Sequence, residues 1–188
     1  ISNTFAYFAA DFTGRKISQP AEVTISSSLD DKGRSWNSVS TRITGMTVCP
    51  SAQRSYSEME GTELKKSPSH TQRVDLLIRV ETIEKFVSMQ RLIEASQAAF
   101  SSPTIALLKK PEEYALVKQA FERPRFIEDL VRYALHYLYK VLSRDGYPTD
   151  TVIYIEAESY ESIHPHNAFA CRQATLGELT KEALGQIE

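Results

Sequence analysis

The histidines of this sequence are few, and their placement is the first indication of chemistry. The chain has four histidines, and His70, His164 and His166 lie in two short segments rich in polar and acidic residues. The fourth, His136, falls opposite the apolar stripe of a long helical segment, so we expect it at the surface. The two polar segments are therefore the candidates for a catalytic or metal-binding site.

The first candidate combines Cys49 with His70. A cysteine thiolate and a neutral imidazole are ligands that zinc and ferrous iron accept. The two residues lie much further apart in the sequence than the ligands of a compact zinc finger, so only the fold can bring them together. The alternative interpretation is a buried, inert thiol at a strand end and an ordinary loop histidine.

The second candidate runs from residue 156 to residue 167 and follows a predicted strand. His164 and His166 flank Pro165, which stiffens the backbone between them, and Glu161 precedes His164 by three positions. This arrangement could form an acid–base site, a metal site or both. The alternative is a solvated acidic turn with incidental histidines.

Hydrophobic periodicity predicts strands, then helices, then strands. Alternation or short apolar runs predict strands at residues 5–12, 23–25, 39–48, 74–80, 152–155 and 167–171, and i, i+3, i+4 spacing predicts helices at residues 83–97, 126–142 and 175–187. A further helix should start near Pro111, and residues 50–69 should form a loop or a mobile helix. This order indicates a single α+β domain over residues 1–188, with an antiparallel sheet and helices on one face. Cys49 and His70 then lie near neighbouring strand ends.

Composition excludes several classes of protein. The 188 residues include 22 Lys and Arg against 24 Asp and Glu, which leaves no basic surplus for binding nucleic acid. No apolar run approaches the roughly 20 residues needed to cross a bilayer, and the first residues lack the pattern of a signal peptide. We therefore expect a cytoplasmic enzyme or binding domain with no nucleic-acid or membrane partner. At this length the core needs no structural metal, so any metal would serve chemistry.

Five ordered motifs resemble the type IB GTP cyclohydrolases and the archaeal relatives that begin methanopterin synthesis. The motifs are CP at 49–50, SHTQR at 69–73, LLKKP at 107–111, PRFIEDLVR at 124–132 and ESIHPHNA at 161–168. The resemblance implies the tunnelling fold, in which an antiparallel sheet with two long helices packed on one face assembles into an oligomeric barrel. It also implies a metal-dependent GTP cyclohydrolase that releases C8 of GTP as formate. The product would be a 7,8-dihydroneopterin phosphate, either triphosphate or cyclic phosphate, for folate or methanopterin synthesis.

The resemblance also implies roles for individual residues. Cys49 and His70 match the family's metal ligands, and Glu161 matches the acid that anchors the purine edge. His164 matches the histidine credited with proton transfer, and His166 belongs to the same catalytic segment. The metal would be one divalent ion per site, Fe²⁺, Zn²⁺ or Mn²⁺, with His164 or His166 as the third ligand.

Substrate binding and assembly follow from the same resemblance. Gln72 and Arg73 are assigned to GTP binding, and Arg73 or the pair Lys109 and Lys110 could meet the triphosphate. The implied assembly is a homo-oligomer, a dimer or a tetramer, with sites at the subunit boundaries.

Two positions depart from the family pattern and keep rival hypotheses open. Type IB enzymes commonly have a second cysteine where this chain has Ser51, a weaker acid or nucleophile that would take over this catalytic position. Lys118 stands where many bacterial members place a glutamate. One rival is therefore a catalytically weakened purine-binding relative, and another is a different purine or pterin enzyme of the tunnelling fold.

Overall fold

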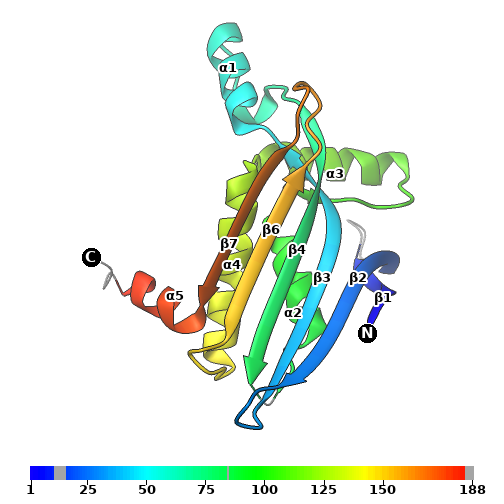
Figure 1. Cartoon of the computed structure of the whole chain (residues 1–188). Coiled ribbons are helices and arrows are strands. Elements are labelled where there is room, and N and C mark those ends of the chain that lie inside the picture. Colours follow the sequence, from blue (N-terminus) through cyan, green and yellow to red (C-terminus); the bar gives the residue numbers. More distant parts are fainter. Residues whose placement is uncertain (11–15, 84, 185–188) are drawn as a thin grey trace.

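The computed structural model describes residues 1–10, 16–83 and 85–184, and its strands form an antiparallel sheet (Figure 1). The strand order is β1-β2-β3-β4-β6-β7, and the short β5 pairs with β3. The strands are β1 Ser2–Ala10, β2 Lys16–Leu29, β3 Ser35–Val48, β4 Thr71–Ile83, β5 Ser102–Pro103, β6 Val152–Ser159 and β7 Ala168–Thr175. The helices are α1 Pro50–Glu60, the 3₁₀ helix η1 Leu64–Lys66, α2 Met89–Ala99, α3 Lys110–Glu122, α4 Ile127–Arg144 and α5 Leu176–Ala183.

One face of the sheet packs against helices. Successive side chains of a strand point to opposite faces, and in β4 the alternate residues Val74, Leu76, Ile78 and Val80 are buried. Figure 1 shows α2 and α4 lying side by side behind this face. The apolar stripe of α4 faces the sheet, and Leu138 at its centre has no exposed surface. The α+β prediction with helices packed on an antiparallel sheet is confirmed.

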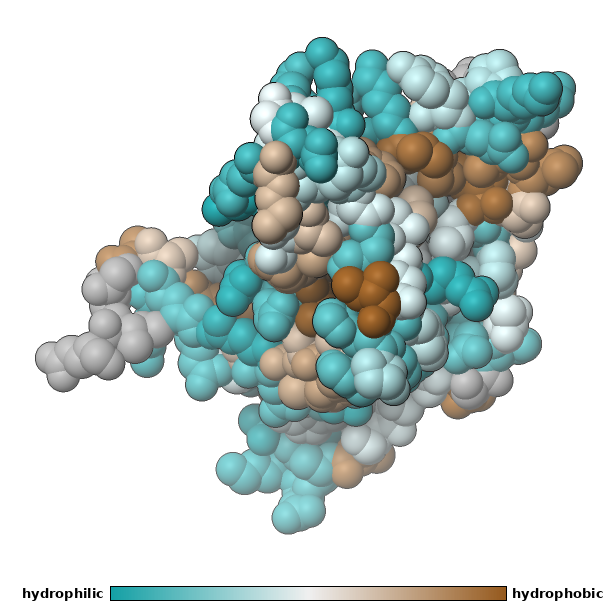
Figure 2. All heavy atoms as spheres, turned by 90° about the horizontal axis from the view of Figure 1, so that it is seen from above, coloured by the Kyte–Doolittle hydropathy of each residue, from teal (hydrophilic) through white to brown (hydrophobic). Residues whose placement is uncertain are grey.

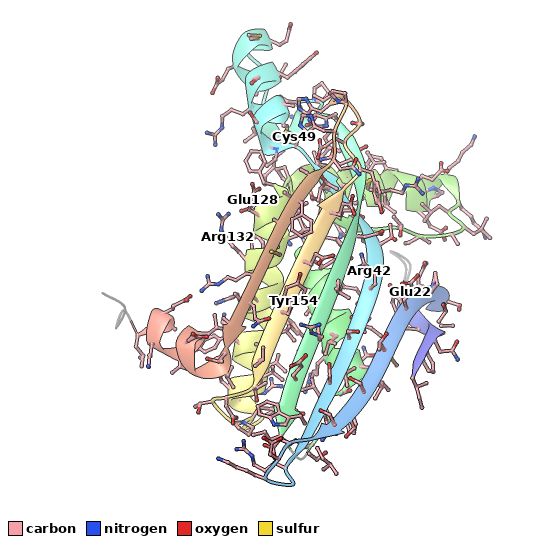
Figure 3. All side chains as sticks on the ribbon, in the orientation of Figure 1. Glu22, Arg42, Cys49, Glu128, Arg132 and Tyr154 are labelled. Carbon is pink, nitrogen blue, oxygen red and sulfur yellow. The ribbon has the colours of Figure 1, made fainter. Side chains whose placement is uncertain are left out.

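The opposite face of the sheet is open and polar. Figure 3 shows Arg42 of β3 and Tyr154 of β6 on this face. The Arg42 guanidinium lies 3.5 Å from the carboxylate of Glu156, and the Tyr154 hydroxyl donates a 2.7 Å hydrogen bond to the same residue. Hydrogen bonding to the charged carboxylate, followed by partial burial, raises the pKa of Tyr154 to about 12. Among the described residues, the core therefore lies between the sheet and the helices.

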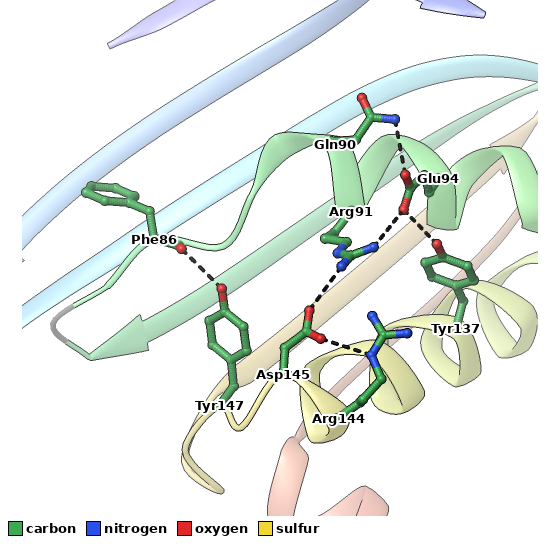
Figure 4. Close-up of polar contacts among 8 residues, drawn as sticks. All are labelled: Phe86, Gln90, Arg91, Glu94, Tyr137, Arg144, Asp145 and Tyr147. Atoms are coloured by element: carbon green, nitrogen blue, oxygen red, sulfur yellow. Dashed lines mark hydrogen bonds and ion pairs between the residues drawn. The ribbon is translucent and has the colours of Figure 1, made fainter. Parts of the chain in front are cut away.

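A polar network joins the two helices of the packed layer (Figure 4). The Tyr137 hydroxyl of α4 donates to Glu94 of α2 at 2.8 Å, and this hydrogen bond is the largest cause of a lowered pKa of the Glu94 carboxyl. Arg91 bridges Glu94 and Asp145, with a nitrogen–oxygen distance of 3.3 Å to each. These contacts fix α2 against α4 at the solvent side of their interface.

The predicted start of one helix needs correction. The helix predicted at 83–97 is α2, which begins only at Met89, because Ile83 still belongs to β4 and pairs with Trp36 of β3. Residues 50–69, predicted as a loop or a mobile helix, contain the helix α1. Its one buried residue is Gln53, so its sequence carries no apolar stripe. Residues 11 and 12 of the first predicted strand and residues 185–187 of the last predicted helix lie outside the described residues.

The end of the molecule that carries α1, α3 and the β6–β7 connection is the end that Figure 2 views. Hydrophobic and hydrophilic residues are mixed across it. No helix within the described ranges is long and apolar enough to cross a membrane. This end of the sheet also holds the two candidate segments for a catalytic or metal-binding site, the one with Cys49 and His70 and the one with Glu161, His164 and His166.

Candidate active site

Cys49 and His70 lie side by side because β3 and β4 are antiparallel neighbours. Cys49 follows the last residue of β3, His70 precedes the first residue of β4, and Val48 pairs with Thr71. The Cys49 backbone N–H donates to the His70 carbonyl at 3.2 Å, and the Ser69 hydroxyl donates to the Cys49 carbonyl at 2.7 Å. The prediction that these residues occupy neighbouring strand ends is confirmed.

The Cys49 side chain caps the start of α1. Its Sγ accepts a hydrogen bond from the Ala52 backbone N–H at 3.5 Å, and Pro50 occupies the first helical turn, where its missing N–H costs nothing. The buried Gln53 anchors this turn, since its amide donates to the carbonyl of Phe121 at 3.1 Å. The thiol is therefore held at a helix N-terminus, which carries positive partial charge.

The second chemical segment reaches the same place through β6. Val74 of β4 pairs with Ser159 at the end of β6, and the Tyr160 backbone N–H donates to the Arg73 carbonyl at 2.9 Å. Glu161 thus lies beside the start of β4. The fold brings together two segments that are about ninety residues apart in the sequence.

Glu161 is connected to His70 through one amide side chain. The Gln72 Nε2 donates to Glu161 Oε1 at 3.3 Å, and Gln72 Oε1 lies 3.0 Å from Nδ1 of His70. The Ser159 hydroxyl, which is 1% exposed, also donates to Glu161 Oε1. Ser162 Oγ lies 3.3 Å from His70 Nδ1. These residues form one hydrogen-bonded chain from the start of β4 to the end of β6.

The three histidines of the two segments converge. The ring centroids of His70 and His164 lie 6.4 Å apart with nearly perpendicular planes, and those of His164 and His166 lie 5.5 Å apart and stack. His136, by contrast, is exposed on α4, as the sequence predicts. The scarcity of histidine was therefore a useful signal, because all three residues it singled out meet at one end of the sheet.

The side chains of the two segments line one cavity of about 220 Å³ at the end of the sheet. Figure 3 shows Cys49 where α1 begins and Glu128 near the start of α4, toward the same end of the molecule. The residues that line the cavity are Cys49, His70, Gln72, Arg125, Phe126, Ile127, Glu128, Glu161, His164, His166 and Ala168. The wall formed by residues 125–128 belongs to the motif at 124–132, for which the sequence predicts no role of its own.

Arg125 supports this wall from within the protein. It is 9% exposed, its Nη1 donates to the Ala98 carbonyl at 2.5 Å, and its guanidinium carbon lies 3.8 Å from the centre of the Tyr133 ring. Burial, and then the nearby charge of Arg123, lowers the pKa of Arg125. Its backbone N–H donates to the Val48 carbonyl at 2.9 Å. Arg125 therefore ties the end of α2 to the end of β3, next to Cys49.

Several residues that the sequence analysis discusses, either as site residues or as departures from the family pattern, lie outside this cavity. Ser51 is exposed on the first turn of α1. Arg73 is exposed on the face of β4 opposite to His70 and Gln72, because side chains alternate along a strand. Lys109, Lys110 and Lys118 are exposed at the start and along the length of α3.

The donor set of the cavity suits a borderline divalent metal such as zinc or ferrous iron. It offers one thiol and the imidazoles of His70, His164 and His166. Within the residues that the structure describes, no three His, Cys, Asp or Glu side chains are already grouped closely enough to hold an ion. The chemistry of the donors fits a metal, whereas their grouping would have to tighten around it.

An antiparallel sheet with helices packed on one face is the subunit architecture that the resemblance implied. Residues 1–170 match the family described as type I GTP cyclohydrolase folE2, and the chain belongs to this family. It is 37% identical over 179 residues to GTP cyclohydrolase MptA of Aeropyrum pernix, covering 95% of this chain and 62% of that protein.

Two further relatives show the same pattern. GTP cyclohydrolase MptA of Methanothermobacter thermautotrophicus is 36% identical over 160 residues, covering 77% of this chain and 50% of the relative. GTP cyclohydrolase FolE2 of Thermosipho melanesiensis is 37% identical over 133 residues, covering 71% of this chain and 45% of the relative. The chain therefore spans about half to three-fifths of the length of these curated relatives.

Proposed function

We propose that the cavity at the end of the sheet is a GTP cyclohydrolase site that hydrolyses GTP at C8, releases formate and yields a 7,8-dihydroneopterin phosphate. The observation that carries the proposal is the meeting of Cys49, His70, Glu161 and His164 in one cavity, from two distant segments. Family membership supports the choice of substrate and reaction. The proposal covers both forms of the product, the triphosphate and the cyclic phosphate. It also covers both uses of the product, in folate and in methanopterin synthesis.

Glu161 is the proposed anchor for the purine. A carboxylate accepts up to about four hydrogen bonds, and Oε1 of Glu161 already receives two, from Ser159 and Gln72. These two donors hold the carboxylate in one orientation. The remaining acceptor capacity suits the N1–H and 2-amino group of guanine, which are two donors on one edge.

Cys49 and His70, with His164 or His166, would hold one divalent metal, Zn²⁺, Fe²⁺ or Mn²⁺. Such an ion, when bound, supplies a water that is acidic near neutral pH and can attack C8. His164 lies next to His70 on the cavity wall and would transfer protons to and from the ring nitrogens as the imidazole ring of GTP opens. Phe126 and Ile127 also line the cavity and would give the base apolar surface to pack against.

A homo-oligomer with sites at subunit boundaries is part of the proposal. Nucleotide-sized ligands usually occupy cavities of roughly 300–1,000 Å³, and the cavity of about 220 Å³ has room for the base but not for the ribose and triphosphate. In a single chain, β1 and β7 are the outer strands of the sheet and offer unpaired edges. A second copy that pairs with such an edge, in a dimer or tetramer, would extend the site. Basic residues such as Arg73, Lys109 and Lys110 remain candidates for the triphosphate in that assembly.

A purine-binding relative with weakened catalysis is the second candidate. The observation in its favour is Ser51, which replaces a thiol by a hydroxyl and lies exposed outside the cavity. Such a protein would keep the Glu161 anchor and bind GTP without opening its ring. The two candidates differ in one measurable quantity, the formate released per GTP bound.

The test supplies GTP under anaerobic conditions with zinc, manganese or ferrous iron and measures formate together with the change in ultraviolet absorbance. Cys49→Ala is the informative variant, and Cys171→Ala is its matched control, because Cys171 is an exposed thiol on β7 away from the cavity. We expect formate from the parent and from Cys171→Ala, and loss of both formate and bound metal in Cys49→Ala. Full turnover in Cys49→Ala would contradict the proposed site.

A further inference from the structure

We infer that Gln72 is a positioning residue, whose side-chain amide fixes the tautomer of His70 and the orientation of Glu161. The effect on turnover rests on the proposed function, whereas the tautomer itself can be measured without substrate or metal. Gln72 lies on β4 two residues after His70, so both side chains leave the strand on the same face, toward the cavity. This placement puts one amide between two groups of the proposed site.

The geometry of the amide is defined by its two neighbours. Gln72 Nε2 lies 3.3 Å from Glu161 Oε1, and Gln72 Oε1 lies 3.0 Å from His70 Nδ1. An ionised carboxylate only accepts hydrogen bonds, so the NH₂ end of the amide must face Glu161. The reverse orientation would bring the amide oxygen against a carboxylate oxygen, two acceptors with no proton between them.

The orientation of the amide then determines which ring nitrogen of His70 carries the proton. With its NH₂ group toward Glu161, Gln72 presents its oxygen to His70, and that oxygen can only accept. Nδ1 of His70 must therefore carry the proton, and Ser162 Oγ at 3.3 Å from the same nitrogen can accept from it as well. In a neutral imidazole the other nitrogen, Nε2, then carries the lone pair. A chain of donors and acceptors starting from the charge of Glu161 thus leaves Nε2 as the nitrogen available to bind a metal or a proton.

Glu161 is positioned by the same amide and by a second, independent donor. The buried Ser159 hydroxyl donates to the same Oε1 atom that accepts from Gln72. Within the described part of the chain, no hydrogen bond reaches Oε2 of Glu161. Removal of Gln72 would therefore loosen both His70 and Glu161, whereas removal of the Ser159 hydroxyl would loosen Glu161 alone.

Nitrogen-15 NMR of histidine-labelled, metal-free protein at pH 8.5 tests the assignment, because the two ring nitrogens of a neutral imidazole differ strongly in chemical shift when only one is protonated. The His70 signals are identified by their loss in His70→Asn. We expect His70 of the parent in the Nδ1–H form. Gln72→Met, which removes both hydrogen bonds at similar size, should give a mixture of both tautomers.

One further variant separates the two halves of the inference. Ser159→Ala removes a donor to Glu161 only, so it should retain the Nδ1–H form of His70. Zinc affinity should fall 10- to 100-fold in Gln72→Met, the range found when the hydrogen-bond partner of a metal-ligating histidine is removed. Far-ultraviolet circular dichroism checks that each variant is folded.

An Nε2–H form of His70 in the parent, or an unchanged tautomer in folded Gln72→Met, would overturn the inference. The Nε2–H result in the parent would overturn the inference whether or not the variants fold. An Nδ1–H His70 in a protein that never releases formate would leave the inference standing and refute the proposed function instead.

Discussion

Gly45, on β3 four residues before Cys49, has no room for a side chain. An ideal Cβ at this position would lie 2.3 Å from Cγ and Cδ1 of Phe100, whereas carbon atoms in contact normally lie about 3.5–4.0 Å apart. Phe100 is completely buried, and Gly45 is paired with Val74 of β4 on one side and Pro103 of β5 on the other. The Phe100 ring cannot move aside without losing its packing in the core, and the backbone at Gly45 cannot move without breaking its strand pairing.

The expected cost of Gly45→Ala follows from this overlap of more than 1 Å. Overpacking a core usually costs 1–3 kcal/mol, and a ring trapped against a paired strand should lie near the upper end, at about 3 kcal/mol. In a protein of this size that corresponds to a melting temperature lower by roughly 6–12 °C. Without the clash the sign would reverse, because alanine is favoured over glycine within regular structure by about 0.5–1 kcal/mol.

Urea unfolding followed by the fluorescence of Trp36, the only tryptophan, measures this cost. Phe100→Leu removes the clashing ring edge, so the double variant with Gly45→Ala should lose at least about 1 kcal/mol less than the sum of the two single variants. Equal or greater stability of Gly45→Ala would refute the packing described here. Strict additivity of the two changes would show that the ring and the backbone do not meet.

Three further predictions concern the helix layer and the cavity. Tyr137→Phe removes the main cause of the lowered Glu94 pKa and should cost about 0.5–1.5 kcal/mol at pH 7. A carboxyl group whose pKa is lower in the folded than in the unfolded protein stabilises the fold at a pH above its unfolded pKa, and this stabilisation is lost as the pH falls through its folded pKa. Urea unfolding at pH 3 should therefore show a smaller difference in stability between the parent and Tyr137→Phe. Glu161→Gln should weaken GTP binding in calorimetry by about 1.5–3 kcal/mol for each lost charge-assisted bond, while Glu158→Gln on the open face should not; equal affinities would remove the purine anchor. A chelator should abolish formate release with an unchanged far-ultraviolet spectrum, and unfolding instead would mean a structural metal.

Much of the fold is predictable from the sequence where one hydrophobic period, that of a helix or that of a strand, dominates a segment. The stripe predicted at 126–142 is α4, Ile127–Arg144, because its apolar residues recur on one face without interruption. The adjacency of Cys49 and His70 was also predictable, since each ends or begins a strand of an antiparallel pair. The start of α2 was not, because Ile83 satisfies both the alternation of β4 and the helical spacing that follows it.

The composition of the cavity was only partly predictable. Alternation along β4 places His70 and Gln72 on one face and Arg73 on the other, so parity alone could have separated these three neighbours. The wall made by Arg125 and Phe126 depends on how the start of α4 meets the end of β3, through the bond from Arg125 N–H to the Val48 carbonyl. Contacts of this kind join segments far apart in the chain and leave no local pattern in the sequence.

Photolabelling with 8-azidoguanosine triphosphate tests the central claim most directly, because it places a reactive nitrogen at C8, the atom that the proposed reaction attacks. Peptide mapping should find the label on the segments that carry Cys49, His70 or His164, and excess GTP should prevent it. Glu161→Gln should reduce the labelling and Glu158→Gln should not. Label confined to the open face of the sheet, or labelling that GTP does not displace, would contradict the assignment of this cavity as the guanine site.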